Sequence, residues 1–173
     1  MTKAPFVVNV ADLLHRPGAR RREQLSGPVE AMLVMDTSVA DGAVATVDAR
    51  LEWVNDGVLA TGTAATAWMG LCRRCLKPVD GRVEAEFQEL FEPHARDGET
   101  YPLKGDRMDL TPMVREALLL ELPLAPLCGD DCAGLCPTCG ADRNAGPCAC
   151  PPAAGDDRWA ALDVLQIDDP PVS

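Results

Sequence analysis

The sequence lacks any long hydrophobic run. No stretch approaches the ~20 consecutive apolar residues that a membrane-spanning helix needs. The apolar segment 6–10 is followed closely by Asp12, so it is too short for the core of a secretory signal. The 173 residues are 47% hydrophobic and 25% charged, as in ordinary globular proteins. We therefore expect a cytoplasmic protein of one domain, with at most a small appendage and no membrane partner.

Positive charge is also scarce. The sequence has 16 Lys and Arg against 27 Asp and Glu, a net charge of -11, which excludes a protein that coats nucleic acid by its overall charge. Basic residues gather at Arg16 and 20–22, and again around the first cysteine pair. Both groups either bind a partner or merely offset neighbouring carboxylates. Residues 128–173 carry eight acidic and two basic residues, which suits a basic protein partner.

The motifs of several enzyme classes are missing. The sequence has no glycine-rich phosphate loop, no nucleophile elbow and no metalloprotease motif. Its two histidines, His15 and His94, lie far apart in the sequence and are expected on the surface. We therefore expect no enzymatic activity and no small-molecule substrate.

Alternating apolar and polar residues predict two half-buried strands, at 44–53 and 83–91, with a Thr- and Ala-rich strand at 58–69 between them. Asn55-Asp56-Gly57 is typical of a tight turn between the first two. A short strand is expected at 6–10. The remaining polar stretches, at 16–28 and 93–107, are expected to be a connector and a loop.

A helix is predicted at about 111–121. Thr111 is a suitable N-cap, Pro112 suits the first turn, and Pro123 stops the helix. Apolar residues recur at helical spacing, and Leu119 and Leu120 widen the apolar face, so we expect a helix packed into the sheet. The helical positions are Met113, Val114, Ala117, Leu118 and Leu122.

The predicted fold class is therefore α+β, an antiparallel β-meander with one packed helix and a C-terminal zinc-ribbon-like segment. Residues 1–127 would form the β-rich core and 128–150 a cysteine-rich zinc-binding segment. Residues 151–173 would form a linker and acidic tail, in which 159–167 is a candidate for one last short element.

Eight cysteines occur in four close pairs. A reducing cytoplasm disfavours disulfides and leaves metal binding or redox chemistry. Four pairs supply two sets of four thiolates, the ligand number of tetrahedral structural zinc, so one or two structural zinc ions are expected. The pairs are Cys72 with Cys75, Cys128 with Cys132, Cys136 with Cys139, and Cys148 with Cys150.

The third pair carries the clearest metal-binding pattern. In Cys136-Pro-Thr-Cys139-Gly140 the two-residue spacer lets both sulfur atoms face one ion, while the glycine permits a left-handed backbone. The first pair has Leu76 at the position where a glycine would be favourable. Its rival interpretation is a redox dithiol, because Arg73 and Arg74 would lower a thiol pKa. However, a thioredoxin-type motif belongs near a βαβ unit rather than between antiparallel strands.

Two groupings of the pairs are possible. Either the first and second pairs share one ion, leaving 136–150 as a local ribbon, or the first pair joins Cys136 and Cys139. We favour the former, because the short span 136–150 closes with little loss of loop entropy. An alternative for the second pair is that both cysteines are merely small buried side chains, and an alternative for the fourth is that only one of Cys148 and Cys150 binds the ion.

The order of motifs resembles that of the YceD family of bacterial proteins. The likeness rests on Cys72-Arg-Arg-Cys75-Leu, Leu122-Pro-Leu-Ala-Pro-Leu-Cys128, Cys132-Ala-Gly-Leu-Cys136-Pro-Thr-Cys139-Gly140, the stretch 144–150, and Asp157-Arg158-Trp-Ala-Ala-Leu162. It implies a role in the accumulation, processing or stability of 23S rRNA, and hence in ribosome assembly. Some members of the family lack the second cysteine cluster, and this chain has Asp156-Asp157-Arg158 where the family tends to have Asp-Pro-Arg.

These observations favour a non-enzymatic ribosome-assembly factor whose partner is large-subunit rRNA or the pre-ribosome. Direct RNA contact is hypothesised for four basic residues that a hairpin tip would present together. One alternative is an acidic adaptor for a basic ribosomal protein or an assembly enzyme. A further alternative is a C-x-x-C oxidoreductase. The four residues are Arg73, Arg74, Lys77 and Arg82.

Overall fold

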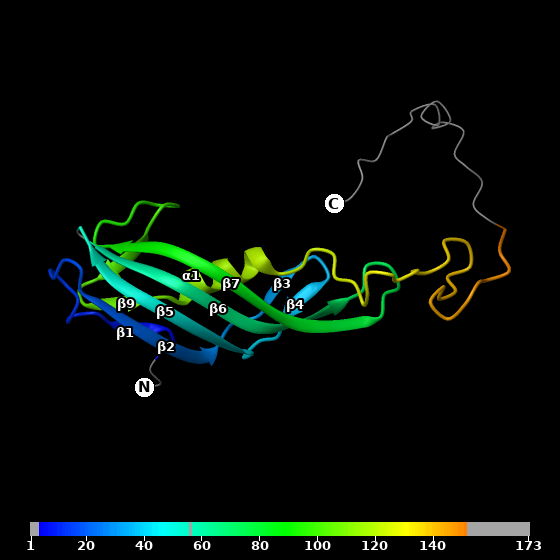
Figure 1. Ribbon diagram of the computed structural model, residues 1–173, viewed down its shortest axis with the longest axis horizontal. Coiled ribbons are helices and arrows are strands. Elements are labelled where there is room, and N and C mark those ends of the chain that lie inside the picture. The colour runs from blue at the N-terminus through cyan, green and yellow to red at the C-terminus, as the bar shows by residue number, and fades with distance from the viewer. Residues whose placement is uncertain (1–3, 56, 152–173) are drawn as a thin grey trace, which may run out of the picture.

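The computed structural model describes residues 4–55 and 57–151. Within them the chain forms nine strands and one helix (Figure 1). The elements are β1 (Val7–Asn9), β2 (Arg20–Pro28), β3 (Met32–Val34), β4 (Thr37–Val39), β5 (Val44–Val54), β6 (Gly57–Leu71), β7 (Pro78–Glu92), β8 (Tyr101–Lys104), β9 (Arg107–Asp109) and α1 (Thr111–Glu121).

Strands β5, β6 and β7 form the centre of the sheet. They pair antiparallel in sequence order, with Trp53 opposite Val58 and Ala64 opposite Ala85. Asn55 has a φ of +49°, a left-handed backbone that asparagine tolerates well in tight turns. The three strands predicted from hydrophobic alternation are therefore confirmed, although β7 begins at Pro78 rather than Val83.

The complete sheet is mixed, so an antiparallel meander describes only its centre. Its strand order is β1-β9-β8-β7-β6-β4-β3, with β2 paired to β5. Strand β8 runs parallel to the end of β7, where Phe91 lies opposite Tyr101. The chain leaves the sheet over 93–100 and returns beside β7 in the same direction. The loop predicted at 93–107 thus contains two strands, β8 and β9.

The connector predicted at 16–28 was wrong, because residues 20–28 form strand β2 along the whole side of β5. Hydrophobic alternation does not reveal this strand, since most of its residues are polar and half-buried or exposed. Its outward side chains instead form polar cross-strand contacts, such as Arg22 Nη2 to Asp48 Oδ2 at 2.5 Å. Opposite charges on facing strands stabilise a pair that buries few apolar side chains.

The hydrophobic core lies between one face of the sheet and helix α1. The inward residues of β5 are buried as the alternation predicted, and α1 buries Met113, Val114 and Leu118. Leu120 is 86% exposed, so it does not widen the buried face of the helix. Leu110 occupies the N-cap position in place of Thr111, whose N–H donates to Asp109 Oδ1 at 2.9 Å. The inward residues of β5 are Ala45, Val47, Ala49, Leu51 and Trp53.

Two regions differ in shape. The sheet body comprises residues 4–55, 57–71 and 78–127. Beyond it, the turn between β6 and β7 (72–77) meets the segment 128–151, and together they form a projection, the cysteine arm, at one end of the molecule (Figure 1). The short element predicted at 159–167 lies outside the described residues.

Candidate metal centres

The first cysteine pair lies at the turn that joins β6 to β7. Leu76 N donates to Cys72 O at 2.8 Å, and Cys72 N donates to Lys77 O at 2.8 Å. These two bonds close a tight turn whose side chains Cys72 and Cys75 lie on the same side. Leu76 adopts a φ of +59°, which is strained for a residue with a side chain.

The third pair repeats this geometry. Gly140 N donates to Cys136 O, and Cys136 N donates to Ala141 O, both at 2.8 Å. Gly140 has a φ of +73°, as predicted for the glycine of a zinc knuckle. Leu76 after the first pair therefore has the same left-handed backbone conformation as Gly140 after the third pair. The absence of a glycine did not prevent the first pair from forming a knuckle.

The sulfur atoms meet in two groups of four, with all sulfur atoms of a group within 4.8 Å of one another. The inner cluster is Cys72, Cys75, Cys128 and Cys132, and the outer cluster is Cys136, Cys139, Cys148 and Cys150. This is the first of the two groupings considered from the sequence. Cys128 and Cys132 therefore belong to a four-sulfur group that could hold a metal ion rather than being isolated small side chains, and both Cys148 and Cys150 reach the outer cluster.

The inner cluster has the dimensions of a metal site. Cys72 Sγ lies 3.8 Å from Cys132 Sγ, and Cys75 Sγ lies 3.6 Å from Cys128 Sγ. A tetrahedral zinc ion with Zn–S bonds of ~2.3 Å places its sulfur atoms about 3.8 Å apart. A disulfide would need ~2.05 Å, and all eight cysteines are free thiols. The donor set and spacing therefore fit a thiophilic divalent cation.

Backbone and guanidinium groups bring the second pair to the first. Arg73 N donates to Pro126 O at 2.8 Å, so the segment that follows α1 is held against the turn. The Arg74 guanidinium donates to Asp130 O at 2.9 Å and to Cys132 O at 3.1 Å. Arg74 thus holds the C-x3-C loop in place around the inner cluster.

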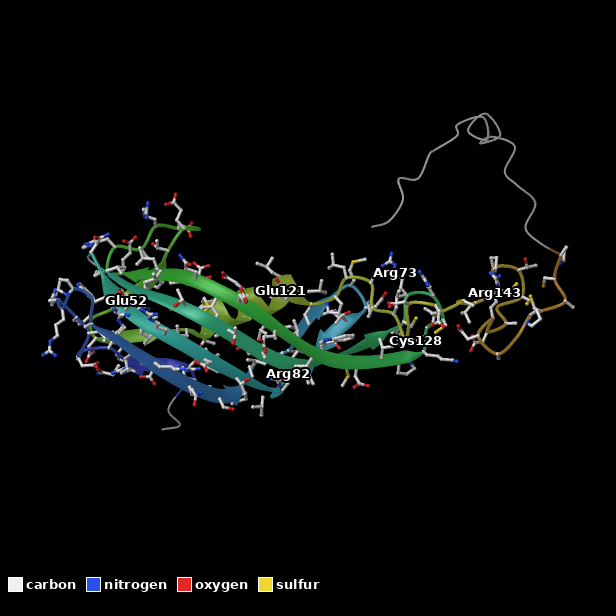
Figure 2. The ribbon with its side chains drawn as sticks, in the orientation of Figure 1. Glu52, Arg73, Arg82, Glu121, Cys128 and Arg143 are labelled. Carbon is white, nitrogen blue, oxygen red and sulfur yellow. The ribbon has the colours of Figure 1, made fainter. Side chains whose placement is uncertain are left out.

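The two clusters differ in their exposure to solvent. Three cysteines of the inner cluster are buried and only Cys128 is exposed. In the outer cluster only Cys136 is buried, while Cys139 is exposed. The inner cluster lies where the arm joins the sheet body, and the outer cluster lies toward the end of the arm, near Arg143 (Figure 2).

The thiol pKa values show how each cluster carries negative charge. Burial raises the pKa of Cys72, but backbone hydrogen bonds from Cys75, Cys128 and Arg74 outweigh it and lower the pKa to about 6. Backbone hydrogen bonds from Cys139 and Thr138 likewise lower the pKa of Cys136 to about 6. The first cysteine of each knuckle therefore ionises readily, as a metal ligand must.

Two other thiols, Cys128 and Cys150, ionise less readily because hydrogen bonds to neighbouring sulfur atoms favour their protonated form. Hydrogen bonding to Cys132, Cys75 and Cys72 raises the pKa of Cys128 to about 12. Hydrogen bonding to Cys139, together with burial, raises the pKa of Cys150 to about 12. Four close thiolates are thus unfavourable by themselves, and a divalent cation would offset their repulsion.

The four basic residues proposed to contact RNA are not equivalent. Arg74 binds backbone carbonyls of the arm, and Lys77 Nζ lies 2.6 Å from Asp142 Oδ2. Arg82 lies on β7, away from the tip, and donates to Thr46 Oγ1 at 3.0 Å (Figure 2). Arg73 is exposed, and its side chain has no hydrogen-bond partner among the described residues. The hairpin tip therefore presents three of the four, without Arg82, and two of those three have partners within the arm.

Asp142 and Asn144 were not identified from the sequence as site residues. The Lys77 ammonium, together with N–H groups of Asn144, lowers the pKa of Asp142 to about 2. Both residues lie between Cys139 and Cys148; the Asn144 side chain reaches Cys132, and the Asp142 side chain reaches Lys77. Asn144 begins one of the stretches that resemble the YceD family, whereas the signal for Asp142 was only its position in the short span between Cys139 and Cys148.

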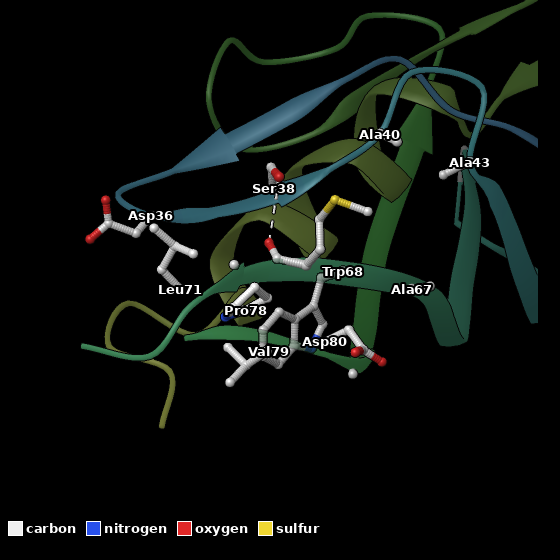
Figure 3. Close-up of a pocket in the computed structure, with 13 residues that line it drawn as sticks. Asp36, Ser38, Ala40, Ala43, Ala67, Trp68, Leu71, Pro78, Val79 and Asp80 are labelled. Atoms are coloured by element: carbon white, nitrogen blue, oxygen red, sulfur yellow. Dashed lines mark hydrogen bonds between the residues drawn. The ribbon is translucent and has the colours of Figure 1, made fainter. Parts of the chain in front are cut away.

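A cavity near the arm lies on the sheet body rather than at the cysteines. It measures about 760 Å³ and lies between the β4 region and the adjoining ends of β6 and β7 (Figure 3). Its lining is mostly apolar, with Asp36 and Asp80 as its charged residues, and Ser38 Oγ donates to Met69 O at 3.4 Å. The cavity brings together no group of metal-ligating side chains.

The two histidines lie on the surface as expected, since His15 and His94 are both exposed. The described part of the chain contains no helix that is both long enough and apolar enough to span a bilayer.

Comparison with known proteins gives relatives along nearly the whole chain. An uncharacterized protein of Mycobacterium tuberculosis is 36% identical over 172 residues, covering 92% of this chain and 80% of its own length. An uncharacterized protein of Mycobacterium leprae is 33% identical over 180 residues, covering 98% of this chain and 82% of its own length. No solved structure matches the chain.

A family model matches the part of the chain that contains both cysteine clusters. The model for "Large ribosomal RNA subunit accumulation protein YceD" matches residues 60–166, more than half of the chain. The matched region begins within β6 and contains β7, α1 and both cysteine clusters. The chain therefore belongs to the YceD family.

Proposed function

We propose that this protein promotes the accumulation of large-subunit ribosomal RNA in the cytoplasm, as a non-enzymatic assembly factor whose two cysteine clusters each hold a structural zinc ion. The observation that carries the proposal is the position of both four-thiol clusters inside the region that matches the YceD family. The family's name indicates large-subunit rRNA as the target, and the geometry supports an arm that is stabilised by metal.

Zinc is the proposed ion because both clusters offer four cysteine sulfur atoms within 4.8 Å of one another, and the inner cluster has sulfur–sulfur distances that suit a tetrahedral site. Such a set favours Zn²⁺ over Mg²⁺ or Ca²⁺, which prefer oxygen ligands. Each complete zinc tetrathiolate would carry a formal charge of -2. It would stabilise the arm, where few apolar side chains are available.

A structural role for both ions supports a protein without catalytic activity. In a four-thiolate site every coordination position is filled by protein, so no position remains for water or substrate. The same argument opposes the oxidoreductase alternative, because Cys72 and Cys75 would be committed to a metal together with Cys128 and Cys132.

The RNA role is tested in a strain that lacks the gene. We expect the ratio of 23S to 16S rRNA to fall and to recover when the wild-type gene is restored. A variant with Cys72→Ser and Cys132→Ser should fail to restore it, whereas Ala149→Ser, which changes an exposed residue between two ligands, should succeed. An unchanged ratio in the deletion strain would overturn the proposed function.

Direct RNA contact is proposed for the exposed cation Arg73, aided by Arg82. Substitution of either residue by Ala should weaken binding of large-subunit RNA and reduce the slope of log K against log salt by about 1. Arg74 and Lys77 are poor tests because their loss would also disturb the arm. Arg20→Ala, an exposed cation on β2, is the matched control. Full RNA affinity in the Arg73→Ala, Arg82→Ala double variant would exclude this surface.

A second candidate is an adaptor that holds a basic ribosomal protein and affects the RNA indirectly. It is favoured by the partners that Arg74, Lys77 and Arg82 already have within the protein, which leave little free positive charge beside the arm. Co-purification with and without nuclease separates the two candidates. A protein partner that remains after digestion supports the adaptor, and partners that all disappear support direct RNA contact.

A further inference from the structure

The loop at 140–147 belongs to the outer cluster by position, because Cys139 precedes it and Cys148 follows it. Its side chains nevertheless contact the inner cluster. Asn144 Nδ2 donates to the sulfur of Cys132 at 3.6 Å, and Asn144 Oδ1 accepts from Ala133 N at 2.7 Å. A side chain from the loop between two cysteines of the outer cluster therefore donates a hydrogen bond to a cysteine of the inner cluster.

Asp142 makes a second connection. Its Oδ1 accepts from Asn144 N at 2.9 Å and from Asn144 Nδ2 at 2.7 Å, which fixes the amide in the orientation that faces Cys132. Its Oδ2 lies 2.6 Å from Lys77 Nζ. Lys77 directly follows the first knuckle, and its carbonyl accepts from Cys72 N. The loop thus contacts Cys132 of the inner cluster directly and reaches the first knuckle through Lys77.

Backbone bonds hold the two clusters close together. Arg143 N donates to Gly134 O at 2.9 Å, and Leu135 N donates to Arg74 O at 3.0 Å. Gly134 has a φ of +71°, and a Cβ there would lie 2.9 Å from Arg74 O. The segment 133–135 is therefore packed between the first knuckle and the loop, without room for a side chain at Gly134.

We propose that Asn144 and Asp142 are positioning residues that couple the two metal sites, so that an ion in either site raises the affinity of the other. The proposal rests on the structural zinc ions proposed above. An ion in the outer cluster would order the loop at 140–147 and thereby present the Asn144 amide to Cys132. An N–H donor stabilises the deprotonated thiolate and disperses the negative charge of a four-thiolate site, which favours the metal-bound form. Because the coupling is an equilibrium property, it must be reciprocal.

The test measures zinc affinity of the inner site in the full chain by competition with a chromophoric chelator. A variant with Cys148→Ser and Cys150→Ser removes the outer site, and we expect its inner site to bind zinc about 10- to 100-fold more weakly, as for loss of a supporting hydrogen bond around a metal. Asn144→Ala keeps all eight cysteines and should weaken the inner site similarly. Arg143→Ala, whose side chain has no partner within the described residues, should leave the affinity unchanged.

A double-mutant cycle separates coupling from a local effect of the asparagine. If the loop acts through the outer ion, Asn144→Ala should add little once Cys148 and Cys150 are replaced. Asn144→Asp conserves the shape of the side chain but places a carboxylate beside the Cys132 thiolate. It should therefore weaken the inner site more than Asn144→Ala does.

Each alternative outcome has a distinct meaning. Equal inner-site affinity with and without the outer cysteines overturns the coupling, and so does an Asn144→Ala effect that is fully additive with their loss. Both of these results leave two zinc ions per chain and the proposed function intact. A chain that binds no zinc overturns the metal assignment and the coupling together.

Discussion

The sheet body and the cysteine arm are ordered by different forces. The body buries a continuous set of aliphatic and aromatic side chains between the sheet and α1. The buried cluster in the arm consists of Cys72, Cys75 and Cys132, with only Val79 and Leu135 packed against it. Hydrophobic burial can therefore stabilise the body by itself, whereas the arm buries little apolar surface and would depend on the proposed metal–ligand bonds. Loss of metal should therefore leave the sheet body folded and should disorder the cysteine arm.

Metal removal should have the largest effect, and it should be confined to the arm. Structural zinc in small peptides contributes roughly 10–16 kcal/mol of apparent binding free energy, and the arm has little else to order it. Chelation should abolish hydrogen-exchange protection over 128–151 while β5, β6 and β7 keep theirs. Re-addition of zinc is the control. Persistent protection in the metal-free arm would show that the two regions do not differ as described.

Truncation of a core side chain should have the opposite effect: it should destabilise the sheet body and leave the arm unchanged. Phe91 is fully buried and stacks on Tyr101 with ring centroids 5.1 Å apart. Phe91→Ala should lower the free energy of unfolding of the body by about 3–5 kcal/mol, measured by urea denaturation at saturating zinc. The zinc content should remain unchanged.

The matched control for this truncation is Leu120→Ala, on the exposed side of α1. Because Leu120 is 86% exposed, the substitution should change stability by less than about 0.5 kcal/mol. Loss of zinc in the folded Phe91→Ala variant would mean that the arm depends on the core more closely than the contacts indicate.

The two knuckles allow a finer comparison. Leu76 and Gly140 share a left-handed backbone, which costs a residue with a side chain about 1–2 kcal/mol. Leu76→Gly should strengthen zinc binding at the inner site by about 1 kcal/mol, and Gly140→Ala should weaken the outer site by a similar amount. No atom lies within 4 Å of a Cβ placed at Gly140, so the second effect would come from backbone strain alone.

Leu76→Ala is the control for the first knuckle, because it shortens an exposed side chain but keeps the Cβ that causes the strain. Its zinc affinity should remain close to that of the wild type. Equal gains in Leu76→Ala and Leu76→Gly would attribute the effect to the leucine side chain rather than to its backbone conformation.

The smallest effect is expected on the surface of the body. A hydrogen bond from Arg22, and a second from Gln24, lower the pKa of Asp48 below its usual value. Because the folded state favours the ionised form, the stabilisation is present above pH ~4 and is lost as the pH falls through the folded-state pKa. The stability difference between wild type and Asp48→Asn should therefore shrink below pH ~4, as measured by urea denaturation. High salt should reduce the difference, and a difference that grows toward low pH would contradict the pKa shift.

Predictions from the sequence succeeded where one face of an element is buried and the other is solvated. Strand β5 and the buried side of α1 show this, because their apolar residues follow the period of the element. Strand β2 was missed because its side chains are mostly polar and form ion pairs and hydrogen bonds with side chains of β5 instead of being buried. Strands β8 and β9 were missed because short strands of three or four residues carry too few alternations to distinguish them from a loop.

The candidate site was predicted in part. The spacing of each cysteine pair indicated the knuckles, and loop entropy favoured the grouping that the structure has. The contacts of Asn144 with Cys132 and of Asp142 with Lys77 join residues 12 and 65 positions apart, respectively. Such contacts depend on how two turns pack together, which local sequence patterns do not describe. The same limit applies to Arg74, whose guanidinium binds the arm rather than solvent.

The amino-acid order alone established the local chemistry of this protein: which residues form turns, which strands bury a face, and which thiols come in pairs. Those properties follow from interactions between residues a few positions apart. Tertiary structure decided which pairs share a cluster, which cations have partners, and how the loop of one cluster reaches the other. These features depend on the long β6–β7 hairpin, which carries Cys72 and Cys75 to a point where a segment more than 50 residues later can meet them.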